Sequence, residues 1–259
     1  MSNTTRGTIR DNLSIIWAIT AKDIVDALQN RLVISLVILL SIALLLPRML
    51  PLILEQPVAA PPSTGALSQG LAAINAVIVI LMMGIALVPS LLFEEKQTKT
   101  LQALLVSPAS IGQVVAGKAL AGAFYILVTA VLIFAISWAD VTHWGLAILF
   151  VIGSTVFSVA VGLVLGSFYD RQQDVVGPMT VLLVILLGGL MARLLGVELP
   201  ALAERILSWV PSVALAEVFR AAFLETVPFT QVLVNLGLVL AVSLPLYALV
   251  IWKVRRSDR

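Results

Sequence analysis

Apolar residues in this chain fall into six long runs, separated by short polar segments. The runs are approximately Leu32–Leu54, Gln69–Phe93, Ile111–Trp138, Trp144–Tyr169, Val175–Leu195 and Phe229–Trp252. Each reaches the roughly twenty residues that an α-helix needs to cross the hydrocarbon of a bilayer. The segments between them are too short to hold a soluble domain. We therefore predict one polytopic domain over residues 1–259, with an interfacial helix in 1–31, a six-span bundle in 32–253 and a basic tail in 254–259.

An amphipathic pattern precedes the first run, between Ile9 and Leu28. One helical face carries the apolar positions, and the charged side chains lie elsewhere on the helix. The residues of the apolar face are Ile9, Leu13, Ile16, Trp17, Thr20, Ile24 and Leu28. Such a helix is expected to lie in the membrane interface. It serves there either as a topological anchor or as a lever that contacts a cytoplasmic partner.

A second amphipathic region, Glu198–Glu225, is interrupted by Pro200 and Pro211. Each half is too short to span the bilayer, so we predict two short outer helices before the last span. The apolar face of the first half is Leu202, Ile206, Trp209 and Val210, and that of the second is Leu215, Val218, Phe219, Ala222 and Phe223. Ser212 is expected to cap the second helix. Glu217 and Arg220, three residues apart, are expected to pair.

The composition agrees with a membrane protein and indicates its orientation. Sixty per cent of residues are apolar and 12% are charged, with a mean hydropathy of +1.09. If both termini are cytoplasmic, twelve of the sixteen Lys and Arg residues lie inside and four lie outside. Because positive charge favours the cytoplasmic side, we expect a multi-pass protein of the cell membrane with both termini inside. The net charge of +2 then reflects topology, and no nucleic-acid partner is expected.

The polar segment between the second and third runs is longer than a simple turn requires. Glu94 and Glu95 leave the second run, and Thr98 or Thr100 can cap a short helix. Leu101, Leu104 and Leu105 give that helix an apolar face, and Pro108 ends it. An apolar face on a short cytoplasmic helix is suited to a groove in another protein. The alternative is a helix that rests on the membrane surface.

A phosphate-loop pattern begins the third run but lacks its essential end. Gly112 to Lys118 match the glycines and lysine of that motif, and Ala119 stands where a magnesium-binding hydroxyl is needed. Ser110 and Gln113 instead form a capping box that starts a helix at Ile111. We therefore expect neither nucleotide binding nor catalysis in this chain.

Small residues recur every four positions in the fourth run. They are Ser154, Ser158, Gly162 and Gly166, and the last two form a G-x-x-x-G pair. Small residues on one helical face let two backbones approach closely. We expect this face to pack against another helix of the same subunit, with a contact between subunits as the alternative.

The segment from Glu94 to Pro108, with Lys118 in the next helix, resembles the coupling region of type-2 ABC exporter permeases. The matching residues are Glu94, Glu95, Thr100, Leu101, Leu104, Leu105, Pro108 and Lys118. Lys99 and Gln102 depart from the pattern of that family. The resemblance implies an all-α membrane protein with an N-terminal interfacial amphipathic helix, six transmembrane helices, a short cytoplasmic coupling helix and two short outer helices before the last span. It also implies a second cytoplasmic contact at Asp170 and Arg171.

The function implied by the resemblance is ATP-driven export. A separate ABC-type ATPase would bind the coupling residues and carry the ATP and magnesium, so this chain would hold no cofactor. A second permease subunit, identical or different, would complete the pathway in membrane lipid. The mostly apolar spans favour an amphipathic or hydrophobic substrate such as a drug, a lipid or a lipid-linked glycan. The alternatives are a self-sufficient secondary carrier or channel, and a membrane-bound enzyme whose catalytic residues the sequence does not reveal.

Overall fold

A computed structural model describes residues 3–29, 63–97, 110–136, 141–194, 200–223 and 228–257. Within these ranges every regular element is an α-helix. The first predicted span, Leu32–Leu54, lies outside the described residues. The greater part of the predicted coupling segment, residues 98–109, also lies outside them.

Five described helices are long and apolar enough to cross a membrane. They are α3 (Ser63–Gln97), α5 (Ile111–Ile136), α6 (Trp144–Phe168), α7 (Gln172–Leu194) and α10 (Phe229–Ser257). Each contains most or all of one predicted apolar run, so five of the six spans correspond to helices of the expected length. The α10 helix continues through the basic residues Arg255 and Arg256, which lie in its last turn.

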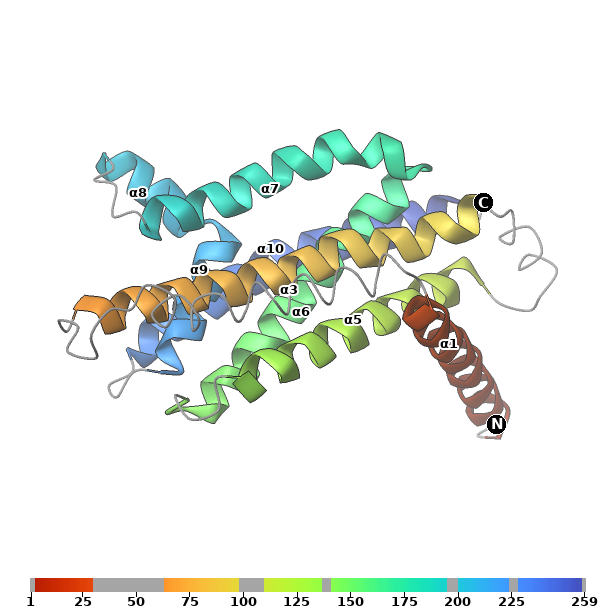
Figure 1. The fold of residues 1–259 in the computed structure, drawn as a ribbon. Coiled ribbons are helices and arrows are strands. Elements are labelled where there is room, and N and C mark those ends of the chain that lie inside the picture. Colours follow the sequence, from red (N-terminus) through yellow and green to blue (C-terminus); the bar gives the residue numbers. More distant parts are fainter. Residues whose placement is uncertain are drawn as a thin grey trace.

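The central element of the bundle is α3, which packs against α5, α6, α7 and α9. In its most apolar stretch 78% of the residues are buried, compared with 22% in α7 and 17% in α10. Figure 1 shows α5 running alongside α3, with α7 more peripheral and α1 projecting from one end. A helix that is apolar all round and buried all round belongs at the centre of a bundle, as α3 does.

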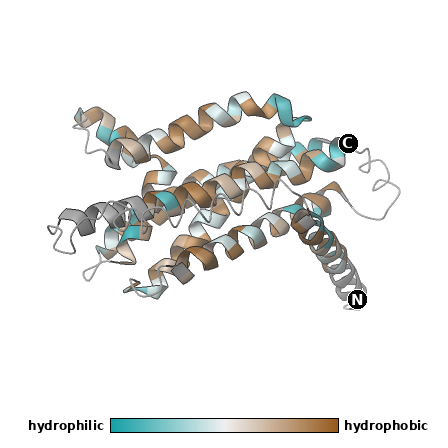
Figure 2. Ribbon diagram, in the orientation of Figure 1, coloured by the Kyte–Doolittle hydropathy of each residue, from teal (hydrophilic) through white to brown (hydrophobic). Residues whose placement is uncertain are grey.

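Apolar residues follow the spanning helices along most of their length, and polar residues gather near the helix ends (Figure 2). Many large apolar side chains of α7 and α10 are exposed, among them Val184 and Leu244, each 66% exposed. In a bilayer such faces meet lipid, where exposing an apolar side chain carries no cost. The low burial of α7 and α10 is therefore compatible with a folded membrane protein.

The two short helices expected before the last span are α8 (Ala201–Ser208) and α9 (Pro211–Ala221). The expected apolar face of α9 is buried against α3, α6, α7 and α10, whereas α8 has no buried residue. Arg220 and Glu217 form the expected pair, with 3.6 Å between Nη1 and Oε1. The capping role expected of Ser212 is wrong. Val210 is the N-cap, and the Ser212 hydroxyl donates to the Leu186 carbonyl of α7 at 2.6 Å.

The N-terminal helix α1 (Asn3–Gln29) packs on α5, and the side that it buries differs from the expected apolar face. Leu13, Trp17 and Leu28 are 62%, 68% and 58% exposed. Thr20 of that face and the charged Asp23 are buried, at 2% and 5% exposed. The α1 helix therefore meets α5 through a partly polar side, and its expected position in the membrane interface stays a prediction.

Candidate functional site

One end of the bundle collects the features that the sequence analysis singled out. We call it the α1 end: it contains α1, the end of α3, the start of α5, the turn between α6 and α7, and the end of α10 (Figure 1). Of the basic residues that the structure describes with side chains, Lys22, Lys96, Lys118, Arg171, Lys253, Arg255 and Arg256 lie here. Arg205 of α8 and Arg220 of α9 lie at the opposite end.

The predicted coupling segment leaves α3 and enters α5 at the α1 end. Glu94 is exposed in the last turns of α3, and Glu95 lies in the same helix. The residues expected to contact a partner between these helices are Thr98, Thr100, Leu101, Leu104, Leu105 and Pro108, and they lie outside the described residues. The structure thus places the two ends of this segment and leaves the helix between them as a prediction.

The start of α5 has the capping box that the sequence predicts. The Ser110 backbone N–H donates to the Gln113 side-chain oxygen at 2.8 Å, and the Gln113 N–H donates to the Ser110 hydroxyl at 3.3 Å. Gly112 and Gly117 lie inside the helix that follows. A phosphate loop needs backbone N–H groups pointing into an open loop, which a helix interior does not offer. The apparent motif is therefore the first turns of a membrane helix.

Lys96 links the end of α3 to the turn between α6 and α7. Its Nζ donates to the Tyr169 carbonyl at 2.7 Å and to Asp170 Oδ1 at 3.1 Å. The side chain of Lys96 is 24% exposed, while that of Asp170 is 88% exposed. The structure thereby brings the predicted second contact, Asp170 with the exposed Arg171 beside it, next to the start of the coupling segment. No local sequence pattern indicates this contact, since the two partners are 74 positions apart.

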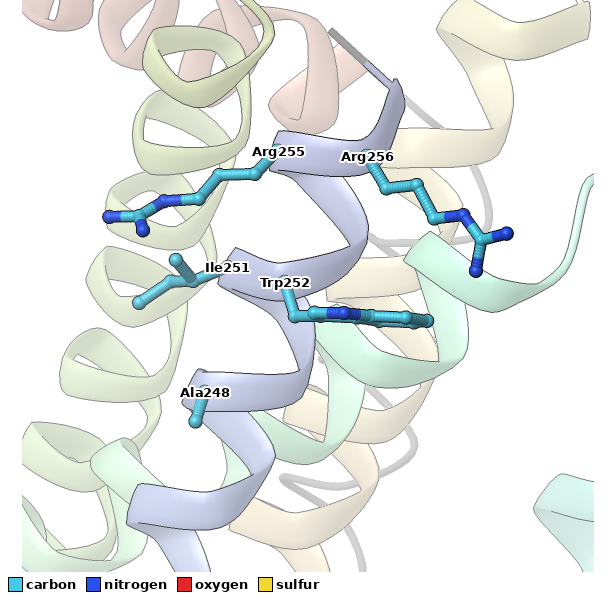
Figure 3. A pocket seen from close by; sticks show the side chains of 5 residues that line it. All are labelled: Ala248, Ile251, Trp252, Arg255 and Arg256. Carbon is cyan, nitrogen blue, oxygen red and sulfur yellow. The ribbon is translucent and has the colours of Figure 1, made fainter. Parts of the chain in front are cut away.

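Basic and aromatic side chains occupy the end of α10. Lys253 Nζ lies 5.6 Å from the ring centroid of Phe168, at the end of α6, and Arg256 lies 5.5 Å from the ring of Trp252. Figure 3 shows Trp252 and Arg256 projecting to one side of α10 and Arg255 to the other. A hollow of about 620 Å³ is lined by these three residues with Ala248 and Ile251. Amphipathic Trp and Arg side chains of this kind are typical of a membrane–water boundary.

Asp23 and Lys118 form an ion pair between α1 and α5. Lys118 Nζ lies 3.2 Å from Asp23 Oδ2, and the side chains of Lys118 and Asp23 are 1% and 6% exposed, respectively. Helical periodicity places Asp23 outside the apolar face of α1 and does not predict this pairing. Lysine and aspartate are rarely this buried unless they are paired. A lysine seven residues into an apolar helix was therefore the sequence feature that could have indicated a buried acidic partner.

The small residues of α6 face α3. Ser154 and Ser158 are buried, at 1% and 0% exposed. A Cβ added at Gly162 would meet the Gly84 carbonyl oxygen of α3 and would lie 2.7 Å from Val88 Cβ. Gly166 lies against Pro89 and Leu92 in the same way. The small-residue face therefore forms a close crossing between two helices of this subunit.

An apolar groove lies among α6, α7, α8, α9 and α10. Its volume is about 420 Å³, and its described lining is apolar. The lining residues include Phe157, Leu182, Leu186, Trp209 and Leu246. Ile206 and Trp209 from α8 cover one side of it, although both are more than half exposed. The groove is of a size that accommodates a small apolar ligand or part of a lipid chain.

A helical bundle with several apolar spans and a basic end is the architecture of an integral membrane protein. The family described as ABC-2 family transporter protein matches residues 20–252, most of the chain, and this protein belongs to that family. Its members are membrane subunits of ABC transporters, and membership implies an ABC ATPase as the partner that hydrolyses ATP. Among curated proteins, none matches this chain.

Proposed function

We propose that this protein is the membrane-spanning subunit of an ATP-driven exporter in the cell membrane. It would move an amphipathic or hydrophobic substrate outward, together with a second permease subunit, while a separate ABC ATPase supplies the energy. The α1 end would face the cytoplasm, since most of the described basic residues gather there. The apolar spans and the apolar groove favour a drug, a lipid or a lipid-linked glycan over a small ion.

The observation that carries the proposal is the bridge from Lys96 to Tyr169 and Asp170. It joins the start of the predicted coupling segment to the predicted second contact on one surface. A partner that binds the segment between α3 and α5 would also reach Asp170 and Arg171. Force applied there would pass into α3, α5, α6 and α7, four of the five described spans.

The coupling helix itself can be tested by placing a charge on its predicted apolar face. Leu101→Asp and Leu105→Asp would each bury an unpaired carboxylate in a partner's groove, which costs several kcal/mol. Gln102→Ala, predicted to lie off that face, is the matched control. The measurement is recovery of the ATPase with the tagged permease from native membranes, with membrane insertion of each variant checked in parallel.

We expect both Asp variants to insert normally and to lose most of the ATPase, while Gln102→Ala retains it. Normal ATPase recovery in both Asp variants would contradict the assignment of residues 98–108 as the coupling site. If the unmodified permease captures no ATPase at all, a self-sufficient carrier or channel becomes the better description.

A further inference from the structure

The contact between α1 and α5, called the joint below, has features that would hold the two helices in one relative position. We propose that Asp23 and Lys118 are positioning residues that hold α1 to α5, so that the two helices move as one rigid body while the transporter works. This inference rests on the proposed function for its mechanical consequence. The joint itself can be tested without any knowledge of the substrate.

The ion pair opposes both separation and sliding of the two helices. Lys118 Nζ lies 3.2 and 3.4 Å from the two Asp23 carboxylate oxygens, and both residues are almost fully buried. Moving α1 away would leave one or both charges in apolar surroundings without their partner, which is strongly unfavourable. Buried ionic pairs can therefore specify one register between two helices.

Three further polar contacts flank the pair along both helices. The Gln113 side-chain amide donates to Asn12 Oδ1 at 2.7 Å, near the start of α5. The Thr20 hydroxyl lies 2.8 Å from the Ile16 carbonyl oxygen of its own helix and 3.1 Å from the Gly117 carbonyl oxygen, so it shares its proton between them. The Tyr125 hydroxyl donates to the Ile24 carbonyl. On each helix the contacts extend over thirteen residues, or about 18 Å of axis. Contacts spread over that length resist rotation of α1 as well as separation.

Only some apolar side chains of α1 take part in its docking. Ile19 lies against Gly117 and Ile24 packs on the apolar core, whereas Leu13, Trp17 and Leu28 are more than half exposed. In a bilayer they gain as much from lipid as they would from protein. The specific position of α1 therefore depends on the polar contacts and on close approach at Gly117, where an added Cβ would lie 2.9 Å from Ile19 Cβ.

The joint lies close to the point at which a movement of the coupling segment would be transmitted to the helix bundle. The α5 helix begins at Ile111, directly after that segment, and Lys118 is two turns further on. A tilt of α5 would therefore carry α1 with it. Asp23 and Lys118 would act by fixing the position of α1, and they need not touch substrate or nucleotide.

The chain offers a matched control because α1 carries a second Lys–Asp pair. Lys22 and Asp26 lie 3.9 Å apart, with side chains 64% and 50% exposed. An exposed pair of this kind contributes little to stability. The test compares Lys118→Met and Asp23→Asn with Lys22→Met and Asp26→Asn, all in the full-length permease reconstituted with its co-purified ATPase.

The distance between α1 and α5 is the primary measurement. The chain contains no cysteine, so spin labels can be attached at Leu13→Cys on α1 and Leu120→Cys on α5, both exposed positions. Unmodified protein should give one narrow distance distribution that ATP with vanadate leaves unchanged. Lys118→Met and Asp23→Asn should lower the docked population to about half or less, because the buried ion pair between the two helices is lost. The Lys22 and Asp26 variants should keep the narrow distribution.

A disulfide can replace the ion pair and show that the role is positional. Cysteines at Ile19 and Gly117 would start with Cβ atoms 2.9 Å apart, so the two helices must separate by about 1 Å to reach disulfide geometry. Replacing Ile19 also removes its Cγ2 methyl, the atom nearest that glycine. In the Lys118→Met background, oxidation should restore the narrow distribution and the ATPase rate of the complex, and reduction should abolish both again. With Asp23 and Lys118 intact, oxidation of the double-cysteine protein should leave its ATPase rate as it is in the reduced form of the same protein.

Three results would overturn the joint. The first is an undocked population that appears with ATP and vanadate in unmodified protein, and the second is an unchanged distance distribution in Lys118→Met. The third is loss of ATPase activity when the double-cysteine protein with Asp23 and Lys118 intact is oxidised. Failure of the proposed function looks different. The unmodified complex would then show no permease-dependent ATPase activity, while the spin-label distances would still respond to Lys118→Met.

Discussion

The crossing of α3 and α6 leads to a specific prediction for Gly162→Ala. The new Cβ would meet the Gly84 carbonyl oxygen and would approach Val88 Cβ to 2.7 Å, closer than real Cβ contacts allow. A backbone carbonyl cannot rotate out of the way as a side chain can, and Val88 is fully buried. The two helices must therefore move apart, which also weakens the contacts of Ser158 and Gly166 with α3.

The magnitude follows from two opposing effects. Alanine in place of glycine stabilises a helix interior by about 0.5–1 kcal/mol. Overpacking a dense interior costs about 1–3 kcal/mol, and the rigid carbonyl places this site near the upper end. We expect Gly162→Ala to lower the free energy of unfolding by about 1–2 kcal/mol. Gly84→Ala, whose Cβ would meet Ser158, should behave in the same way.

Gly237→Ala is the matched control, because this glycine lies inside α10 and an added Cβ meets nothing within 4 Å. It should be neutral or stabilising. The assay is thermal unfolding of purified protein in one detergent, followed by the loss of the monodisperse peak in size-exclusion chromatography. A Tm for Gly162→Ala equal to or above that of Gly237→Ala would refute the close crossing of α3 and α6.

Three further predictions concern other contacts. Ser212→Ala should lower the Tm, because it removes a buried hydrogen bond to the Leu186 carbonyl that is worth about 1 kcal/mol. If Ser212 acted only as a helix cap, Ser212→Asn would keep the native Tm. Lys96→Met should reduce ATPase recovery more than Asp170→Asn, because Lys96 also donates to the Tyr169 backbone carbonyl. Equal losses in the two variants would mean that only the ion pair matters. The purified chain should show no ATP binding by isothermal titration, since Lys118 is engaged with Asp23, and micromolar affinity would contradict this.

Local sequence signals determined the helices and several of their ends. The capping box at Ser110 and Gln113 starts α5, Pro200 precedes α8, and Pro211 is the first residue of α9. These features depend on residues within about four positions of one another, so they can be read directly from the chain. The apolar runs likewise specified five long helices, because only a helix satisfies the backbone within lipid.

The tertiary structure alone decided which faces meet and which distant groups pair. Asp23 finds Lys118 across 95 positions and Lys96 finds Asp170 across 74. Helical periodicity cannot supply these pairings. In a membrane it cannot reliably supply the buried face either, because lipid and protein interior are both apolar. Only the packed structure showed that, on the apolar side of α1, Leu13, Trp17 and Leu28 are exposed while Thr20 is buried, together with the charged Asp23.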